Sequence, residues 1–197
     1  MKDMKVRITL LEDILGTLPG DPEIYKSYIA SKSPDASTIE DEVAAVGAAQ
    51  VYDNKITVFP RDKDGSVCIY DYLIRGHFKK AGSALAKVPN TKSSKLKAFK
   101  KHVDLYVFVY PRLIKIGSPE DVTIRERPLR ASTPQGERVA ISASECIPAG
   151  TSFEFTIKLL IDDDEDLVCE WLDYGQYNGL GQWRNSGQGS FTWERIE

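Results

Sequence analysis

MKVRITLL, residues 4–11, alternates apolar with polar side chains, which places the apolar ones on one face of an extended chain. This pattern predicts a half-buried first strand. Three further segments are expected to be strands: LYVFVYP at 105–111, TSFEFTIKLLI at 151–161 and SFTWERI at 190–196. The continuous β-branched and aromatic run of 105–111 predicts a central strand of the sheet.

Shorter signals lie between these strands. Asp64-Gly65 separates residues 55–62 from residues 66–74 and predicts that the two segments form a β-hairpin. Residues 112–116 are expected to continue the preceding strand or to bend away from it. Several Gly and Pro breaks predict that residues 117–150 are rich in loops, with short strands.

Capping residues and apolar spacing predict the helices. They are expected at residues 21–32, 37–50, 77–87, 93–102 and 163–176. Together with the strands they give a β-α-β-β-α-β plan with insertions. The fold class is therefore α+β, and a chain of 197 residues fits one domain, residues 1–197.

Composition excludes several classes of protein. The chain is 42% hydrophobic and 28% charged, as in an ordinary soluble domain. No apolar run approaches the ~20 residues of a membrane span, and the N-terminus lacks a signal peptide, so we expect a cytoplasmic protein with no membrane partner. Three widely spaced cysteines indicate neither a metal site nor a disulfide framework, and we expect no cofactor.

Charge is distributed unevenly along the chain. The net charge is −3, which argues against a general polyanion binder. Residues 75–101, however, hold nine Lys or Arg and no Asp or Glu, whereas residues 162–166 are all acidic. A basic segment on an acidic chain is compatible with a phosphate-binding footprint.

Four segments, in order along the chain, resemble the RAMP superfamily, and most closely the backbone subunit of type III CRISPR effectors. They are ITLLEDILGT (8–17), IRGHFKKA (74–81), ERVAISASECIPAGTSFEF (137–155), and the glycine-rich loop with Gly179-Leu180-Gly181 and Gly187-Gln188-Gly189. The second segment departs from the family pattern: Arg75 replaces a proline, His77 and Phe78 replace serines, and Ala81 replaces a glycine. In the loop, Ser186 replaces an arginine.

The resemblance implies an RRM-like, ferredoxin-like RNA-binding fold with a C-terminal glycine-rich loop. Residues 20–52 have no counterpart in the family and are expected to form a helical insertion. The chain is also similar to phage and prophage proteins, which implies a phage-encoded protein in the bacterial cytoplasm. Its expected partner is single-stranded RNA or a nucleotide.

Two groups of residues are candidates for binding RNA or a nucleotide. The first lies at an expected strand-to-helix junction, where a helix N-terminus would add amide donors: Arg75, Gly76, His77, Lys79 and Lys80. The second is the glycine-rich loop, where glycines permit close approach of the backbone to phosphates and aromatic and planar side chains can stack on bases: Gly179, Gly181, Trp183, Arg184, Gly187 and Gly189. A solvated lysine face and a purely structural loop are the competing interpretations.

Two other sets of basic residues could likewise either bind phosphates or have no role in binding. Five lysines would extend the basic face: Lys92, Lys95, Lys97, Lys100 and Lys101. Four arginines, Arg125, Arg127, Arg130 and Arg138, could clamp phosphates or pair with the acidic helix at 162–166, and we favour the pairing.

Three functions follow from these residues. The first is a non-catalytic RNA-binding protein, which we favour. The second is an anti-defence interaction protein, either a mimic of a subunit of a host defence complex or a sponge for a nucleotide signal. The third is an endoribonuclease with Asp53 or His77 as the catalytic residue. Self-association along RNA is implied by the resemblance alone.

Overall fold

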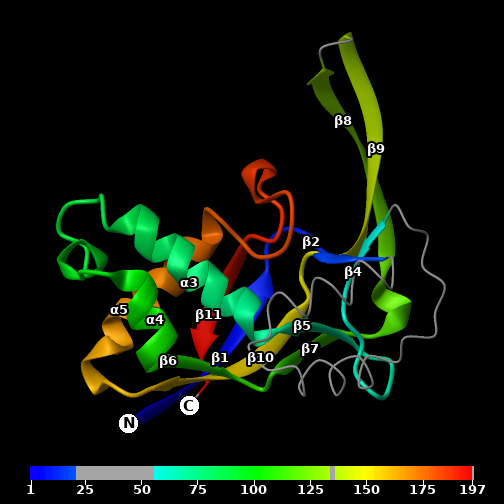
Figure 1. Ribbon diagram of the computed structural model, residues 1–197. Helices are drawn as coiled ribbons and strands as arrows, with labels where there is room; N and C mark the ends of the chain where they lie inside the picture. Colours follow the sequence, from blue (N-terminus) through cyan, green and yellow to red (C-terminus); the bar gives the residue numbers. More distant parts are fainter. Residues whose placement is uncertain (21–55, 134–135, 197) are drawn as a thin grey trace, which may run out of the picture.

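The computed structural model describes residues 1–20, 56–133 and 136–196, and for residues 128–133 and 136–141 it describes the backbone only (Figure 1). Of the predicted insertion at 20–52, residues 21–52 lie outside the described ranges, so the insertion and the single-domain boundary stay predictions. Within the described ranges, no helix is long and apolar enough to cross a membrane.

A four-stranded sheet organises the molecule. Its strands are β1 (Lys2–Leu10), β6 (Val107–Tyr110), β10 (Ser152–Leu159) and β11 (Phe191–Arg195), in the spatial order β11-β1-β10-β6. All three strand pairs are antiparallel. The predicted first, long and last strands are confirmed, and the mixture of helices and sheets confirms the α+β class.

Two helices cover one face of this sheet, α3 (Asp71–Leu85) and α5 (Glu165–Asp173) (Figure 1). The alternation in β1 is the cause, because Met4, Val6, Ile8 and Leu10 all point into the core under the helices. The aromatic rings of Phe78 on α3 and Trp171 on α5 lie 5.7 Å apart at the centre of that core. Such rings bury large apolar areas, so the helix face of the sheet carries most of the packing.

The start of α3 corrects the prediction that 66–74 is one strand. Strand β5 (Val67–Tyr70) ends after four residues, and the helix begins at Asp71. From there the apolar residues follow the helical period, with Ile74, Phe78 and Ala81 buried on one face. The acidic Asp71 lies in the first turn, where the helix dipole favours a negative charge.

The predicted hairpin at Asp64-Gly65 is present only as a turn. The Oδ1 atom of Asp62 accepts hydrogen bonds from the backbone amides of Asp64 and Ser66, and a single bridge joins Arg61 to Val67. Beyond it the strands separate. Strand β4 (Ile56–Val58) pairs with β3 (Leu18–Pro19) and β9 (Gly136–Ile147), whereas β5 pairs with β7 (Leu113–Gly117).

A side chain explains this separation. The backbone amide of Phe59 donates to the buried carboxylate of Glu145, at 2.8 Å, instead of to a neighbouring strand. Pro60, the next residue, has no amide hydrogen to continue a ladder.

Strand β6 is an edge strand, so the prediction of a central strand at 105–111 is wrong. Its only partner among the described residues is β10. Residues 105 and 106 belong instead to helix α4 (Phe99–Tyr106), which is separated from a short 3-10 turn at Ser93–Lys95 by Ala98 in a left-handed conformation. The chain then bends away into β7, one of the two outcomes expected for 112–116.

A long β-hairpin replaces the loops predicted for 117–150. Strand β8 (Thr123–Thr133) pairs with β9 from Thr123↔Cys146 to Thr133↔Gly136, and the hairpin projects well beyond the rest of the molecule (Figure 1). Pro128 misled the prediction. Among the described residues β8 pairs with β9 alone, and proline is tolerated in such an edge strand. The base of the hairpin is held by β2 (Ile14–Leu15) and β4, which both pair with β9.

We expect the substitution Phe78→Ala to lower the free energy of unfolding by about 3–5 kcal/mol, because it empties a fully buried site. Tyr177→Ala removes an aromatic side chain that is 75% exposed and should change stability by less than about 0.5 kcal/mol. Urea unfolding monitored by circular dichroism measures both. Equal losses in the two variants would contradict the packing described here.

Candidate nucleic-acid interface

The glycine-rich loop between α5 and β11 is closed by contacts between backbone segments. The amide of Leu180 donates to the carbonyl of Gly189 at 2.9 Å, and the amide of Gly189 donates to the carbonyl of Asp13 at 2.8 Å. A Cβ atom on Gly179 would overlap the carbonyl group of Gly189, and a Cβ on Gly189 would overlap the carbonyl oxygen of Leu180. These two glycines are therefore required by packing.

Two further glycines of the loop differ in their surroundings. Gly181 has a φ of +78°, and a Cβ there would lie 2.6 Å from the carbonyl oxygen of Leu15. Gly187 has a φ of +85°, but a Cβ there would meet nothing within 4 Å. Packing accounts for Gly181 and turn geometry for Gly187, so none of the four glycines needs a phosphate to explain it.

The tip of the loop presents Trp183 beside a short 3-10 turn, Arg184–Ser186. The indole N–H groups of Trp171 and Trp193 donate to Ser93 Oγ and Asp173 Oδ1. Within the described ranges Trp183 has no such acceptor. Its ring instead lies under the guanidinium of Arg127, with 4.4 Å between the Cζ atom and the ring centroid. Trp183 is thus a half-buried aromatic residue, as Trp193 is, and differs from Trp193 in that its indole N–H has no hydrogen-bond acceptor among the described residues.

A pocket of about 530 Å³ opens at this tip. It is lined by one residue of α3, one of β8 and six of the loop: Lys80, Arg127, Gly181, Gln182, Trp183, Arg184, Asn185 and Ser186. No lining residue is acidic. Burial lowers the pKa of Lys80, and the positive charge of Arg184 lowers it further. In the part of the chain that the structure describes, Lys80, Arg127 and Arg184 form no ion pair.

The structure separates Lys80 from its predicted companions on α3. Arg75 and Lys79 both contact the carboxylate of Asp104 on α4, at 3.2 and 2.5 Å. Gly76 is exposed and lies inside the helix, five residues after its first residue, so the helix N-terminus predicted beside it is elsewhere. Its amide is therefore not one of the free donors of a helix N-terminus.

His77 is a core residue. Its side chain is 1% exposed, its Nε2–H donates to the carbonyl oxygen of Trp171 at 2.9 Å, and its ring packs against Phe191. Burial lowers the pKa of His77 to about 4. Its enclosed imidazole is not exposed to a ligand in this structure, so the position of His77 lends no support to either predicted role, and both stay predictions. Asp53, the other catalytic candidate, lies outside the described residues.

Among the described side chains, neither Arg125 nor Arg127 of β8 pairs with the acidic segment at 162–166. Arg125 contacts Asp13 at 2.5 Å and Gln188 at 2.7 Å, and Arg127 contacts Trp183. The side chains of Arg130 and Arg138 lie outside the described part. The acidic residues have other partners: the N-terminal amine for Asp162, His102 for Asp164, Lys2 and Arg195 for Glu165, and Lys92 for Asp166.

The remaining lysines form a separate surface around α4. Lys95, Lys97, Lys100 and Lys101 are exposed, and within the described ranges they form no ion pair. Lys92 is held by Asp166 at 2.9 Å. None of the five lines the pocket.

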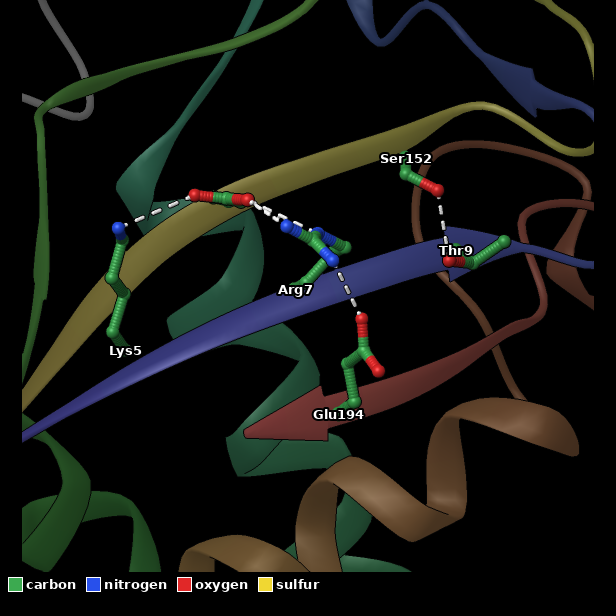
Figure 2. Close-up of polar contacts among 6 residues, drawn as sticks. Lys5, Arg7, Thr9, Ser152 and Glu194 are labelled. Carbon is green, nitrogen blue, oxygen red and sulfur yellow. Dashed lines mark hydrogen bonds and ion pairs between the residues drawn. The ribbon is translucent and has the colours of Figure 1, made fainter. Parts of the chain in front are cut away.

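The face of the main sheet that points away from the helices is a lattice of paired charges (Figure 2). Arg7 on β1 contacts Glu154 on β10 and Glu194 on β11, and Lys5 also contacts Glu154, at 3.5 Å. The outward residues of β1 and β10 include no aromatic side chain. This face therefore offers neither unpaired charge nor a stacking surface at its centre.

Sequence reasoning missed Arg127 as a member of the pocket. The signal was its spacing: Arg125 and Arg127 alternate with Glu126, so both lie on one face of β8. In the described residues, no group of three or more His, Cys, Asp or Glu side chains could hold a metal ion.

No protein-family model matches the chain, and no curated protein matches it. Solved structures do match its fold. A chain of the Type III-B Cmr-beta complex bound to cognate target RNA matches with a TM-score of 0.50 and 13% identity, covering 100% of this chain and 60% of that one. A chain of a Type IV-B CRISPR complex matches with a TM-score of 0.50 and 12% identity, covering 99% and 90%.

This chain therefore spans 60% of the length of the Cmr-beta chain that it matches. At such low identities the match shows the fold alone. The fold is like that of subunits of CRISPR complexes.

Gly187 and Gly189 provide a matched test of the closure of the loop. Gly187→Ala should cost about 1 kcal/mol of stability, because it adds only the strain of a positive φ. Gly189→Ala should cost more than about 3 kcal/mol, because its Cβ also displaces a backbone carbonyl. Chemical denaturation measures both values. If the two variants are equally stable, the loop is not closed as described.

His77 predicts a pH dependence of stability. Since its pKa is about 4 in the folded protein and about 6.5 when unfolded, the unfolded state takes up the proton first, and the stabilisation present above pH 6.5 is lost as the pH falls toward 4. We expect the wild type to lose about 2 kcal/mol more than His77→Phe between pH 7 and pH 5. Parallel denaturation curves at the two pH values measure this difference. Identical pH profiles would show that His77 is not enclosed.

Proposed function

We propose that this chain is a non-catalytic RNA-binding protein with a RAMP-like, ferredoxin-like fold. It binds single-stranded RNA in the pocket between α3, β8 and the glycine-rich loop. Lys80 and Arg184 contact phosphates in this proposal, and Trp183 stacks on a base.

The arrangement of the elements supports the proposed fold. The order β1-α3-β6-β10-α5-β11 is a β-α-β-β-α-β sequence, with the other elements as insertions. Numbered by their order in this unit, the four strands lie 4-1-3-2 across the sheet, and all are antiparallel. One of the matched structures, Cmr-beta, is bound to target RNA, which makes RNA the first ligand to consider.

One observation carries the proposed function: three cations meet around a half-buried tryptophan with no acidic residue among them. Elsewhere in the described chain, Arg7, Arg75 and Lys79 lie within 4 Å of carboxylates. Burial, and to a smaller extent the nearby charge of Arg184, lower the pKa of Lys80, so the charged form of this lysine is disfavoured where it has no counter-ion. A phosphate between Lys80 and Arg184 would supply that counter-ion.

Single-stranded RNA fits this pocket better than a duplex does. Stacking on an aromatic side chain requires a base that is free of the helical stack, and one tryptophan with flanking cations is a common arrangement for such bases. The open face of the main sheet contributes little in this proposal, because its charges already neutralise one another.

A free nucleotide is the second candidate ligand, and the pocket volume favours it. About 530 Å³ lies within the range of small-molecule sites and can hold a mononucleotide or part of a cyclic oligonucleotide. Titration with an adenine mononucleotide and with a 12-nucleotide RNA separates the two. Tighter binding of the mononucleotide would favour a nucleotide-binding function.

The pocket predicts a sharp contrast between two adjacent lysines. Lys80→Ala and Arg184→Ala should each weaken binding of a 12-nucleotide RNA by about tenfold and reduce the slope of log K against log[salt] by about 0.7. Lys79→Ala removes an equal charge, but this lysine is already paired with Asp104. It should therefore change the affinity for RNA by less than about twofold. Fluorescence anisotropy at several salt concentrations measures these effects. Equal effects of Lys79→Ala and Lys80→Ala would place the RNA elsewhere.

A further inference from the structure

Arg127 occupies the position on Trp183 where a base would stack. Its guanidinium lies 4.4 Å from the ring centroid, so this face of the indole is covered. Both side chains line the pocket, and both are only half-buried. The aromatic surface that would receive a base is therefore covered by one of the cations that would receive a phosphate.

The backbone that carries Arg127 is fixed independently of this contact. Two residues earlier on the same face of β8, Arg125 is held by Asp13 at 2.5 Å and by Gln188 at 2.7 Å. The backbone carbonyl of Asp13 also accepts a hydrogen bond from the amide of Gly189 in the glycine-rich loop. Strand and loop thus stay together when the Arg127 side chain moves.

We propose that a nucleobase replaces the guanidinium of Arg127 on Trp183, and that the freed Arg127 contacts the phosphate of the same strand. This inference rests on the RNA-binding function proposed above and adds a specificity to it. The pocket then selects a base joined to a phosphate over a phosphate chain without bases. Arg127 acts in two ways, as a cover of the aromatic ring in the free protein and as a phosphate ligand in the complex.

The exchange is favourable on general magnitudes. Stacking of one base on an aromatic side chain strengthens binding by about 5- to 150-fold, whereas an exposed cation–π contact is worth about 2- to 5-fold. Arginine also gains a bidentate contact when it turns to a phosphate. A base can therefore displace Arg127, and its affinity is reduced by the factor that the cation–π contact contributes.

The test compares two probes on four forms of the protein. The probes are a 12-nucleotide oligoadenylate and adenosine, each carrying the same fluorescent label; adenosine has the base but no phosphate. The proteins are the wild type, Arg127→Ala, Arg127→Lys and Trp183→Leu. Anisotropy titrations at three salt concentrations give the affinities and the salt slopes.

We expect Arg127→Ala to bind adenosine about 2- to 5-fold more tightly than the wild type does, because the guanidinium no longer competes for the ring, and to lower the salt slope for oligoadenylate by about 0.7. Arg127→Lys keeps the charge without the planar stack, so it should also bind adenosine more tightly and leave the slope for oligoadenylate unchanged. Trp183→Leu should abolish detectable binding of adenosine.

Unchanged or weaker adenosine binding in Arg127→Ala would overturn the exchange, since Arg127 would then not compete with the base. This failure is distinct from failure of the proposed function. If Lys80→Ala and Arg184→Ala leave oligoadenylate binding unchanged, or if the wild type binds neither probe, RNA does not use the pocket and both proposals fall.

Discussion

The backbones of Gly179 and Gly189 touch with no room for a side chain between them, and the position of the candidate site follows from this contact. It closes the loop after α5 onto the segment that follows β1, through the hydrogen bond from Gly189 to Asp13. Closed in this way, the loop places Trp183 and Arg184 beside Lys80 of α3. A pocket made by three elements thus depends on two residues that have no side chain.

Much of the main sheet could be predicted from sequence, because apolar and polar residues alternate along its long strands. Residues 4–11 and 151–161 are such segments, and both are strands in the structure. The failures came where tertiary contacts override local pattern. The hairpin at Asp64-Gly65 opens because Glu145, far away in the sequence, takes the amide of Phe59. The long β8–β9 hairpin was missed because the glycines and prolines within 117–150 were interpreted as interruptions of the strands. The paired strands accommodate Pro128.

The candidate site was predictable only in part, because the folding of the chain decides which of the candidate residues meet. Lys80, Trp183 and Arg184 were candidates from sequence, and the structure brings all three to one pocket. Arg75, His77 and Lys79 were grouped with Lys80 because they are close in sequence, but a helix turns successive side chains to different sides. The start of α3 decides which of them faces the loop, and the sequence pattern placed that start six residues too late. Arg127 comes from a strand whose partners only the folded chain reveals.

The paired charges on the open face of the main sheet have a consequence for how this chain can change in evolution. Arg7 lies between Glu154 and Glu194, with Lys5 beside the first of them (Figure 2). Reversing the charge at position 7 would place three negative charges on adjacent strands, so the change is tolerated only with a compensating change at 154 or 194. The three positions should therefore vary together among descendants of this sequence, and their joint variation would record the pairing of β1 with its two neighbours.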